Sequence, residues 1–429
     1  MPTDPSAYRS DGVLADVKVV EFAQNAAVPQ CGRLLAGMGA DVVKVEPIKG
    51  DAMRGLAELA PREARAFAVI NPGKRGISLD LAAPGANDVV DRLVAWADVC
   101  LVGLKAADVE RFGLGWERVR AINPRLVQLV LTAFGPVGPD AKEGGYDVLV
   151  QGASGLGLSM ARTRDGTPLP VRPAMFDFST GNTAAAGVIA ALRHRDATGL
   201  GQRVDASLLG TAMTLGTPLL ASFPGDDRAI ADIEDSLSEL RAAGVDFETQ
   251  RDVYEAQVVS GGGVFRIYFR HYQTADGLIS VAGMSPGLVA KFHEITGIDG
   301  PPNLIDQSTP EFQSVVDEAE ALFRTRTTDE WMATLRAANY PCARFNFHHD
   351  AIAAEQAVAN DYVVDLEHPT FGEYRTVGMP FRFDATPTAV AEPSPRLGEH
   401  TREVLAELGF VPTAVDTLHA DGVVRSFDA

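Results

Sequence analysis

The sequence has few cysteines, few basic residues and no long apolar run, and each shortage excludes a class of protein. Its three cysteines, Cys31, Cys100 and Cys342, are isolated and odd in number, which indicates neither a disulfide framework nor a metal-binding pair. No apolar run approaches the roughly 20 residues that span a bilayer, and residues 1–15 lack the apolar core of a signal peptide. We therefore expect a cytoplasmic protein with no membrane partner.

Basic residues are outnumbered along the whole chain. The 429 residues include 38 Lys and Arg against 57 Asp and Glu, a formal net charge of −19. Such a surface repels nucleic acids and anionic membranes, so we expect neither as a partner. A small polyanionic ligand stays compatible with this charge where a few cations gather locally. The length exceeds that of one compact core and predicts two domains.

Several common cofactor and catalytic motifs are absent. A buried-strand pattern at residues 17–22 is followed by a helix and by a second strand that ends at Glu46, as in a dinucleotide site. The turn at residues 24–29, however, lacks the Gly-x-Gly-x-x-Gly that lets a pyrophosphate approach the backbone. The sequence also has no Walker loop and no His-x-x-x-His pair. We expect no permanently bound cofactor and no metal.

The first 210 residues alternate short apolar runs with helical patterns. Repeated strand–helix–strand order predicts a parallel sheet covered by helices, a Rossmann-like α/β domain. The expected strands are residues 17–22, 41–46, 98–102, 125–133 and 202–206, and the expected helices are residues 29–39, 84–97, 108–122 and 182–195.

The rest of the chain predicts a second, smaller domain and a return to the first. We expect residues 1–222 to form the N-terminal part of the large domain, and the acidic, helical residues 223–257 to form a linker. Residues 258–345 combine a glycine loop, a hairpin around 274–277 and three helical patterns, which indicates a small α+β domain. Residues 346–429 are expected to be a return linker and the C-terminal part of the large domain.

One acidic residue stands out between two phenylalanines. Asp177 lies in the run Met-Phe-Asp-Phe-Ser-Thr-Gly that leads into an alanine-rich helix. An acid at this place commonly caps a helix or lies in its first turn. A carboxylate is also ionised at neutral pH and can act as a nucleophile without a general base. The residues alone leave both roles open.

Several segments, in the same order along the chain, resemble class III CoA-transferases, the family of formyl-CoA transferase and carnitine CoA-transferase. The similarity runs from about residue 13 to residue 425. It implies an enzyme that moves coenzyme A from an acyl-CoA to a small carboxylic acid. It also implies ring-shaped chains interlocked as a homodimer. The segments are residues 34–47, 71–80, 111–116, 123–125, 134–135, 145–147, 199–205, 377–381 and 397–401.

The resemblance also implies roles for four residues around the reacting centre. Asp177 matches the family's nucleophile, which forms a mixed anhydride and then an aspartyl-CoA thioester. Gly261 and Gly262 match the glycine loop that covers it and offers N–H groups to a developing oxyanion. Tyr146 matches an active-site tyrosine, although a tyrosine packed for structure is the alternative.

The remaining implied roles concern the binding of coenzyme A. Ala26 and Ala27 align with first-turn positions that approach the ligand. Lys74 and Arg75 match an Asn-x-x-Lys-Arg motif, and Arg111 matches another position that contacts coenzyme A. For each of the three cations the alternative is a salt-bridging side chain with a structural role.

The chain departs from the family pattern after the strand at 98–102. The usual Glu-Asn-Phe-Arg-Pro-Gly is replaced by residues 102–107, Val-Gly-Leu-Lys-Ala-Ala. Leu104 then gives adenine an apolar contact in place of an aromatic one. Lys105 keeps a charge but loses the planar fork of arginine.

Two other functions fit part of the pattern. An α-methylacyl-CoA racemase of the same fold needs a histidine where this chain has Tyr146, and a tyrosine with a pKa near 10 is a poor partner for proton exchange. A non-catalytic binding protein would have no use for Asp177 or for the glycine loop. The transferase is therefore the preferred interpretation.

Overall fold

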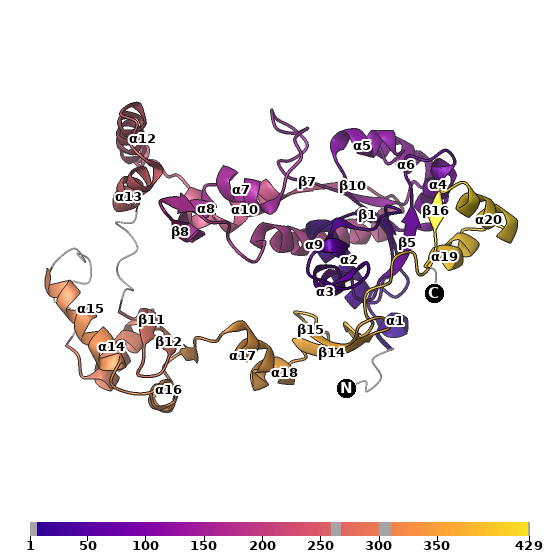
Figure 1. Ribbon diagram of the computed structural model, residues 1–429. Coiled ribbons are helices and arrows are strands. Elements are labelled where there is room, and N and C mark those ends of the chain that lie inside the picture. Colours follow the sequence, from indigo (N-terminus) through magenta and orange to yellow (C-terminus); the bar gives the residue numbers. More distant parts are fainter. Residues whose placement is uncertain (1–6, 259–266, 300–309, 428–429) are drawn as a thin grey trace. The chain divides into compact units, whose positions relative to one another are not determined.

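The computed structural model describes residues 7–258, 267–299 and 310–427, drawn in Figure 1. The chain divides into two compact units. One contains residues 1–221 together with 355–429, and the other contains residues 222–354. Within the described ranges, no helix is long and apolar enough to cross a membrane.

The first unit contains a seven-stranded sheet in the order β10-β7-β6-β1-β2-β5-β16. All pairs are parallel except the pair of β5 with β16 (Val424–Arg425). Counted along the chain, the parallel strands follow the doubly wound order 3-2-1-4-5-6. The prediction of a mixed α/β fold with a mostly parallel sheet is confirmed. The parallel strands are β1 (Lys18–Ala23), β2 (Asp41–Glu46), β5 (Arg75–Leu79), β6 (Val99–Gly103), β7 (Val127–Thr132) and β10 (Arg203–Ser207).

Helices cover both faces of this sheet (Figure 1). Side chains alternate along a strand, so Val19 of β1 packs in one core and its neighbour Val20 in the other. The first core includes α2 (Ala27–Gly37) and α9 (Met175–Thr198), and the second includes α4 (Ala86–Trp96) and α19 (Thr401–Glu407). A parallel sheet buried on both faces needs nearly continuous apolar strands, which explains why these strands could be predicted from the sequence.

The other elements of this unit are short. Its helices are α1 (Ala7–Asp11), η1 (Ala52–Gly55), α3 (Arg65–Ile70), α5 (Ala106–Arg111), α6 (Trp116–Ile122), α7 (Asp147–Ala153), α8 (Leu156–Met160), α10 (Leu208–Leu215), α11 (Thr217–Leu220), α18 (Glu355–Ala359) and α20 (Pro412–Ala420). Its two-stranded ribbons pair β3 (Glu58–Ala60) with β4 (Glu63–Ala64), β8 (Thr163–Arg164) with β9 (Thr167–Pro168), and β14 (Val363–His368) with β15 (Gly372–Val377).

The sheet changes direction between β1 and β6. The chain leaves β1 toward β2 on one side and leaves β6 toward β7 on the other. In open α/β sheets, ligands bind outside the carboxyl ends of strands at such a switch point. The end of β6 and the start of α2 lie close together here, because a Cβ added at Gly103 would lie 2.9 Å from Val28 Cγ2. The switch point is therefore the natural place for a ligand site.

Two predicted helices differ from the structure. The single helix expected at residues 108–122 is wrong, because Gly113, with φ of 73°, separates α5 from α6. The helix expected at 182–195 is longer than predicted, because α9 begins at Met175. Asp177 therefore lies inside the first turn of a helix.

The second unit is built around a three-stranded antiparallel sheet of β11 (Phe269–Gln273), β12 (Leu278–Ala282) and β13 (Cys342–Arg344). The predicted hairpin between β11 and β12 is confirmed. Its core is aromatic, with the Tyr272 ring stacked 4.1 Å from that of Phe323. The helices are α12 (Asp227–Ala242), α13 (Phe247–Val258), α14 (Pro286–Thr296), α15 (Pro310–Phe323), α16 (Thr328–Ala337) and α17 (His348–Ala353).

Candidate active site

Asp177 is the third residue of α9, and a second acid holds the turn on which it lies. Asp147, the first residue of α7, is buried, and its carboxylate accepts the backbone N–H of Phe176 at 2.7 Å and of Asp177 at 3.1 Å. The first N–H groups of a helix have no partner within it, so Asp147 caps α9 from outside. Gln151 donates its amide to Asp147 and fixes that side chain in turn.

The environment of Asp177 suits an attacking carboxylate. Within the part of the chain that the structure describes, no donor hydrogen-bonds to its side chain, which is half-buried. Burial, together with the negative charge of Asp147, raises the pKa of Asp177 to about 6. At neutral pH the group is ionised, yet it is more basic than an ordinary aspartate. The Asp177 carboxylate is therefore charged at neutral pH and is also a better nucleophile than an ordinary aspartate.

Helix α9 approaches the start of α2 unusually closely. Gly181 lies four residues after Asp177 and shares its face of the helix. A Cβ added at Gly181 would lie 2.5 Å from the carbonyl oxygen of Ala27, so only glycine permits this approach. One residue further, Gln30 Nε2 donates to Asn182 Oδ1 at 3.0 Å. The structure thus places the face of α9 that carries Asp177 beside the turn of Ala26 and Ala27, both of which are buried.

Three more predicted residues lie on connections at the carboxyl edge of the sheet. Leu104 directly follows β6 and is half-buried. Lys105 is exposed at the N-cap of α5, and its Cε would lie 3.2 Å from a Cβ added at Gly144. Tyr146 follows two residues later at the N-cap of α7, with 65% of its surface exposed. Lys105 and Tyr146 therefore belong to neighbouring loops.

The three predicted phosphate-binding cations are placed differently from one another. Arg111 is exposed and lies 3.9 Å from Asp108, so its guanidinium is accessible to a ligand. The Arg75 guanidinium instead pairs with Asp41, Glu403 and Glu407 at 2.6–2.9 Å.

Lys74 is the most enclosed of the three cations. Its side chain is fully buried, and its Nζ donates to Glu21 Oε2, Pro29 O and Asn71 Oδ1 at 2.8–2.9 Å. Three acceptors use the whole donor capacity of an ammonium group. The positions of Lys74 and Arg75 favour the structural alternative that the sequence left open.

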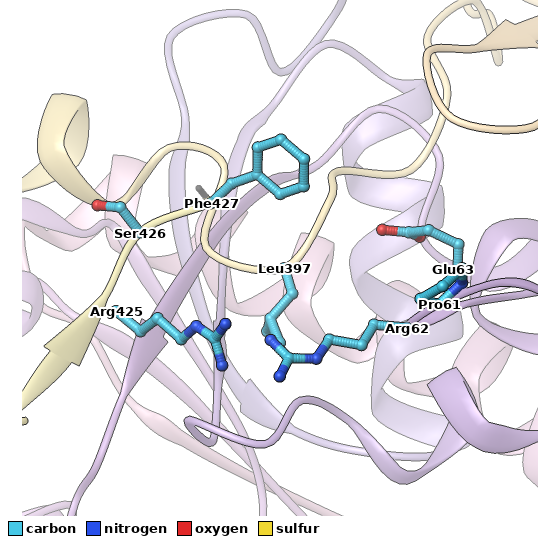
Figure 2. A pocket seen from close by; sticks show the side chains of 7 residues that line it. All are labelled: Pro61, Arg62, Glu63, Leu397, Arg425, Ser426 and Phe427. Atoms are coloured by element: carbon cyan, nitrogen blue, oxygen red, sulfur yellow. The ribbon is translucent and has the colours of Figure 1, made fainter. Parts of the chain in front are cut away.

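Gly261 and Gly262 lie outside the described residues. Among the residues that are described, no group of three or more His, Cys, Asp or Glu could hold a metal. A pocket of about 200 Å³, shown in Figure 2, contains none of the predicted site residues. Pro61, Arg62, Glu63, Leu397, Arg425, Ser426 and Phe427 line it.

Sequence reasoning did not assign Asp147 or Gly181 to the site. Asp147 belongs to residues 145–147, one of the segments that resemble the family, and Gly181 ends the run around Asp177. Their roles depend on contacts with residues 30 and about 150 positions away, which no local pattern reveals.

Fold and site together define a doubly wound α/β protein in which Asp177 is a half-buried carboxylate on the helix that packs against the switch-point turn. Residues 14–401 match the model of CoA-transferase family III, and the chain belongs to that family. The family resemblance and the expectation of a class III CoA-transferase enzyme are confirmed.

Relatives and solved structures agree with this assignment. The chain is 30% identical to a formyl-CoA:oxalate CoA-transferase of Streptomyces avermitilis, over 96% of this chain and 99% of the relative. It is 29% identical to a cinnamoyl-CoA:phenyllactate CoA-transferase of Clostridium sporogenes, over 95% and 96% of the two chains. A crystal structure of a CAIB/BAIF family protein from Brucella suis superimposes with a TM-score of 0.70 at 26% identity, covering 93% of this chain and 100% of the other.

Proposed function

We propose that this protein transfers coenzyme A from an acyl-CoA donor to a small carboxylic acid, with Asp177 as the covalent nucleophile. The observation that carries the proposal is the Asp177 carboxylate itself. It lies in a capped first helical turn and is half-buried, with a raised pKa. It also lies on the face of α9 that packs against the switch-point turn.

The reaction begins when an Asp177 oxygen attacks the thioester carbonyl carbon. The carbon–sulfur bond breaks, the thiolate of coenzyme A leaves with the electron pair, and a mixed anhydride remains on Asp177. The thiolate then attacks the aspartyl carbonyl and expels the donor acid as its carboxylate. The product of this half-reaction is an aspartyl-CoA thioester.

The acceptor acid reverses these steps. Its carboxylate attacks the aspartyl-CoA thioester and releases the thiolate, which then takes the acceptor acyl group and restores the Asp177 carboxylate. Each step exchanges one activated acyl group for another, so no ATP is consumed. Water competes for both intermediates, so the proposal needs a site from which water is excluded.

Binding of the acyl-CoA is assigned to the carboxyl edge of the sheet. Ala26 and Ala27 provide the close backbone approach, Leu104 an apolar contact and Lys105 and Arg111 the accessible cations. Gly261 and Gly262 remain part of the proposal as oxyanion donors, and Tyr146 as a group beside the reacting acyl chain.

The proposal also includes a homodimer of interlocked, ring-shaped chains in the cytoplasm. Exposed apolar side chains on α7, α10 and α11 support an interface between two chains. Because α7 and α10 are in contact, these side chains lie on neighbouring helices. Light scattering after size-exclusion chromatography should give the mass of two chains. These side chains are Val148, Leu149, Met213, Leu215 and Leu219, each 46–61% exposed.

Product analysis tests the proposed reaction. The protein is incubated in deuterated water with an acyl-CoA and a panel of carboxylic acids. Transfer yields a CoA ester of an added acid, whereas a racemase would incorporate deuterium at the α-carbon without making a new ester. Asp177→Ala should lose transfer, and Asp196→Asn, an exposed acid on the same helix, should keep it. Transfer at the wild-type rate in Asp177→Ala would exclude the covalent route.

A further inference from the structure

Four charged side chains are completely buried beneath α2. Glu21 of β1 lies directly opposite Lys44 of β2, and its two oxygens pair with Lys44 at 3.0 Å and with Lys74 at 2.8 Å. Lys44 also pairs with Asp51 at 3.0 Å. None of the four side chains is exposed to solvent. We refer to Glu21, Lys44, Asp51 and Lys74 as the charge clamp.

Three further hydrogen bonds of the charge clamp go to the backbone around one turn. Lys44 Nζ donates to the carbonyl of Ala23, the last residue of β1, at 2.8 Å. Lys74 Nζ donates to the carbonyl of Pro29, in the first turn of α2, at 2.8 Å. Between these two points, the backbone N–H of Asn25 donates to Asp51 Oδ1 at 3.3 Å. The segment 24–28 is therefore held at both ends and in the middle.

This turn has a specific backbone conformation. Asn25 has φ of 66°, in the left-handed region that non-glycine residues rarely adopt, although asparagine adopts it more readily than most. The close fit of α2 over the charge clamp is just as specific, because a Cβ added at Gly32 would lie 2.1 Å from Glu21 Oε2. Burying four charges is itself costly unless the geometry is fixed and the hydrogen bonds are satisfied. An arrangement of this kind is expected to contribute more to the geometry of the turn than to the stability of the fold.

The turn held in this way is the one that faces the nucleophile. It carries Ala26 and Ala27, and the carbonyl of Ala27 lies against Gly181 of α9. A shift of this turn would move the start of α2 and the bound thioester relative to Asp177. Misplacement by about 1 Å can reduce a rate about 100-fold.

We propose that the charge clamp is a positioning device that fixes the switch-point turn against the nucleophile helix, and that Lys74 acts through it rather than by binding the phosphates of coenzyme A. The catalytic consequence rests on the proposed transferase function. The structural part, that Lys74 orders the turn, does not depend on it.

The test uses three variants of the full chain. Lys74→Met removes the lysine and leaves Glu21 with one partner. Glu21→Gln/Lys74→Met removes both charges, which keeps the interior neutral if the single variant folds poorly. Arg195→Met is the control, because it removes a buried cation whose ion pair, with the partly exposed Asp98, lies at the far end of α9.

Amide hydrogen exchange over residues 23–30 measures the turn without any substrate. Exchange should accelerate about tenfold or more in both Lys74 variants and stay unchanged in Arg195→Met. Unchanged exchange in the double variant would overturn the proposal, whether or not the wild-type protein proves to be a transferase.

Kinetics with an acyl-CoA and with its 3′-dephospho analogue separates positioning from phosphate binding. In the double variant kcat should fall about 10- to 100-fold. The ratio of kcat/KM between the two esters should stay at its wild-type value. If that ratio falls toward one while kcat is retained, Lys74 binds the phosphate and the proposal is wrong. Arg195→Met should change neither quantity.

Discussion

The carboxylate of Asp147 accepts the backbone N–H of Asp177 at 3.1 Å, so one buried acid fixes the turn that presents the other. The two acids affect each other in two ways. Asp147 orders the start of α9, and its negative charge contributes to the raised pKa of Asp177. The position and the pKa of the proposed nucleophile thus depend on the same neighbour, and the two effects can be tested separately.

The first prediction concerns the pH dependence of transfer. Because burial and Asp147 raise the pKa of Asp177 to about 6, kcat/KM should fall about tenfold per pH unit below that value. In Asp147→Asn the amide oxygen can still cap the helix, but the negative charge is gone. The acid limb of the kcat/KM profile should therefore move to lower pH. A limb that stays in place would show that Asp147 does not act on the charge of Asp177.

The second prediction is that Asp177→Asn stabilises the protein while it abolishes transfer. A pKa raised from 3.8 to about 6 means that the folded state favours protonated Asp177. That stabilisation is complete below about pH 4 and is lost as the pH rises through 6. For this half-buried group we expect Asp177→Asn to raise the free energy of unfolding by about 1–2 kcal/mol at pH 8.

Urea denaturation of the wild-type protein and of Asp177→Asn, at pH 8 and at pH 4, measures this gain in stability. At pH 4 the gain should be nearly absent, because the wild-type side chain is then largely neutral as well. Asp196→Asn, on the same helix, serves as the control and should show no such pH-dependent gain. Equal or lower stability of Asp177→Asn at pH 8 would contradict a desolvated carboxylate.

The third prediction compares two glycines of α9. Gly181→Ala places a Cβ 2.5 Å from the carbonyl oxygen of Ala27 and must push α9 away from α2. We expect a loss of about 1–3 kcal/mol and reduced transfer. Gly187→Ala meets only Val204 Cγ1 at 3.2 Å and gains helix propensity, so its stability should stay near that of the wild type. Thermal unfolding and transfer rates of the two variants test this prediction. If both substitutions changed stability and transfer to the same extent, α9 and α2 would not approach as closely as described.

The fourth prediction separates two arginines that the sequence assigned to the same role. Arg75 joins Asp41 of β2 to Glu403 and Glu407 of α19, so Arg75→Ala should lower stability by about 1–2 kcal/mol. Its Michaelis constant for acyl-CoA should not change. Arg111→Ala should raise that constant and leave stability within about 0.5 kcal/mol, because Arg111 is exposed and its pair with Asp108 is 3.9 Å long. The reverse pattern would place the phosphates at Arg75.

The sequence predicted most of the large domain, because buried parallel strands are short continuous apolar runs. The strand at residues 41–46 has the predicted bounds, and the other predicted strands are shifted by only one or two residues. β5 was not predicted, although its residues 75–79 lie within a segment that was used for the family resemblance. The boundary errors in α5, α6 and α9 come from one glycine and from a helix start that is capped by a distant residue.

The candidate site could be predicted only in part. Asp177 and the alanines of the first turn were identifiable because the family motifs surround them. The environment of Lys74 was not, because its partner Glu21 is 53 residues away and both side chains become buried only after β1, β5 and α2 have packed. A lysine in a motif has the same sequence signature whether it binds a ligand or an interior carboxylate, and only its burial separates the two.

The most direct test of the account is to trap the acyl group on Asp177. Hydroxylamine, added while the protein turns over an acyl-CoA, should convert an activated Asp177 carbonyl to a hydroxamate, and mass spectrometry of the peptide that contains residue 177 detects the change. The account predicts modification of Asp177, loss of activity in proportion, and no modification when acyl-CoA is omitted. Full inactivation with an unmodified Asp177, or continued turnover in hydroxylamine, would contradict it.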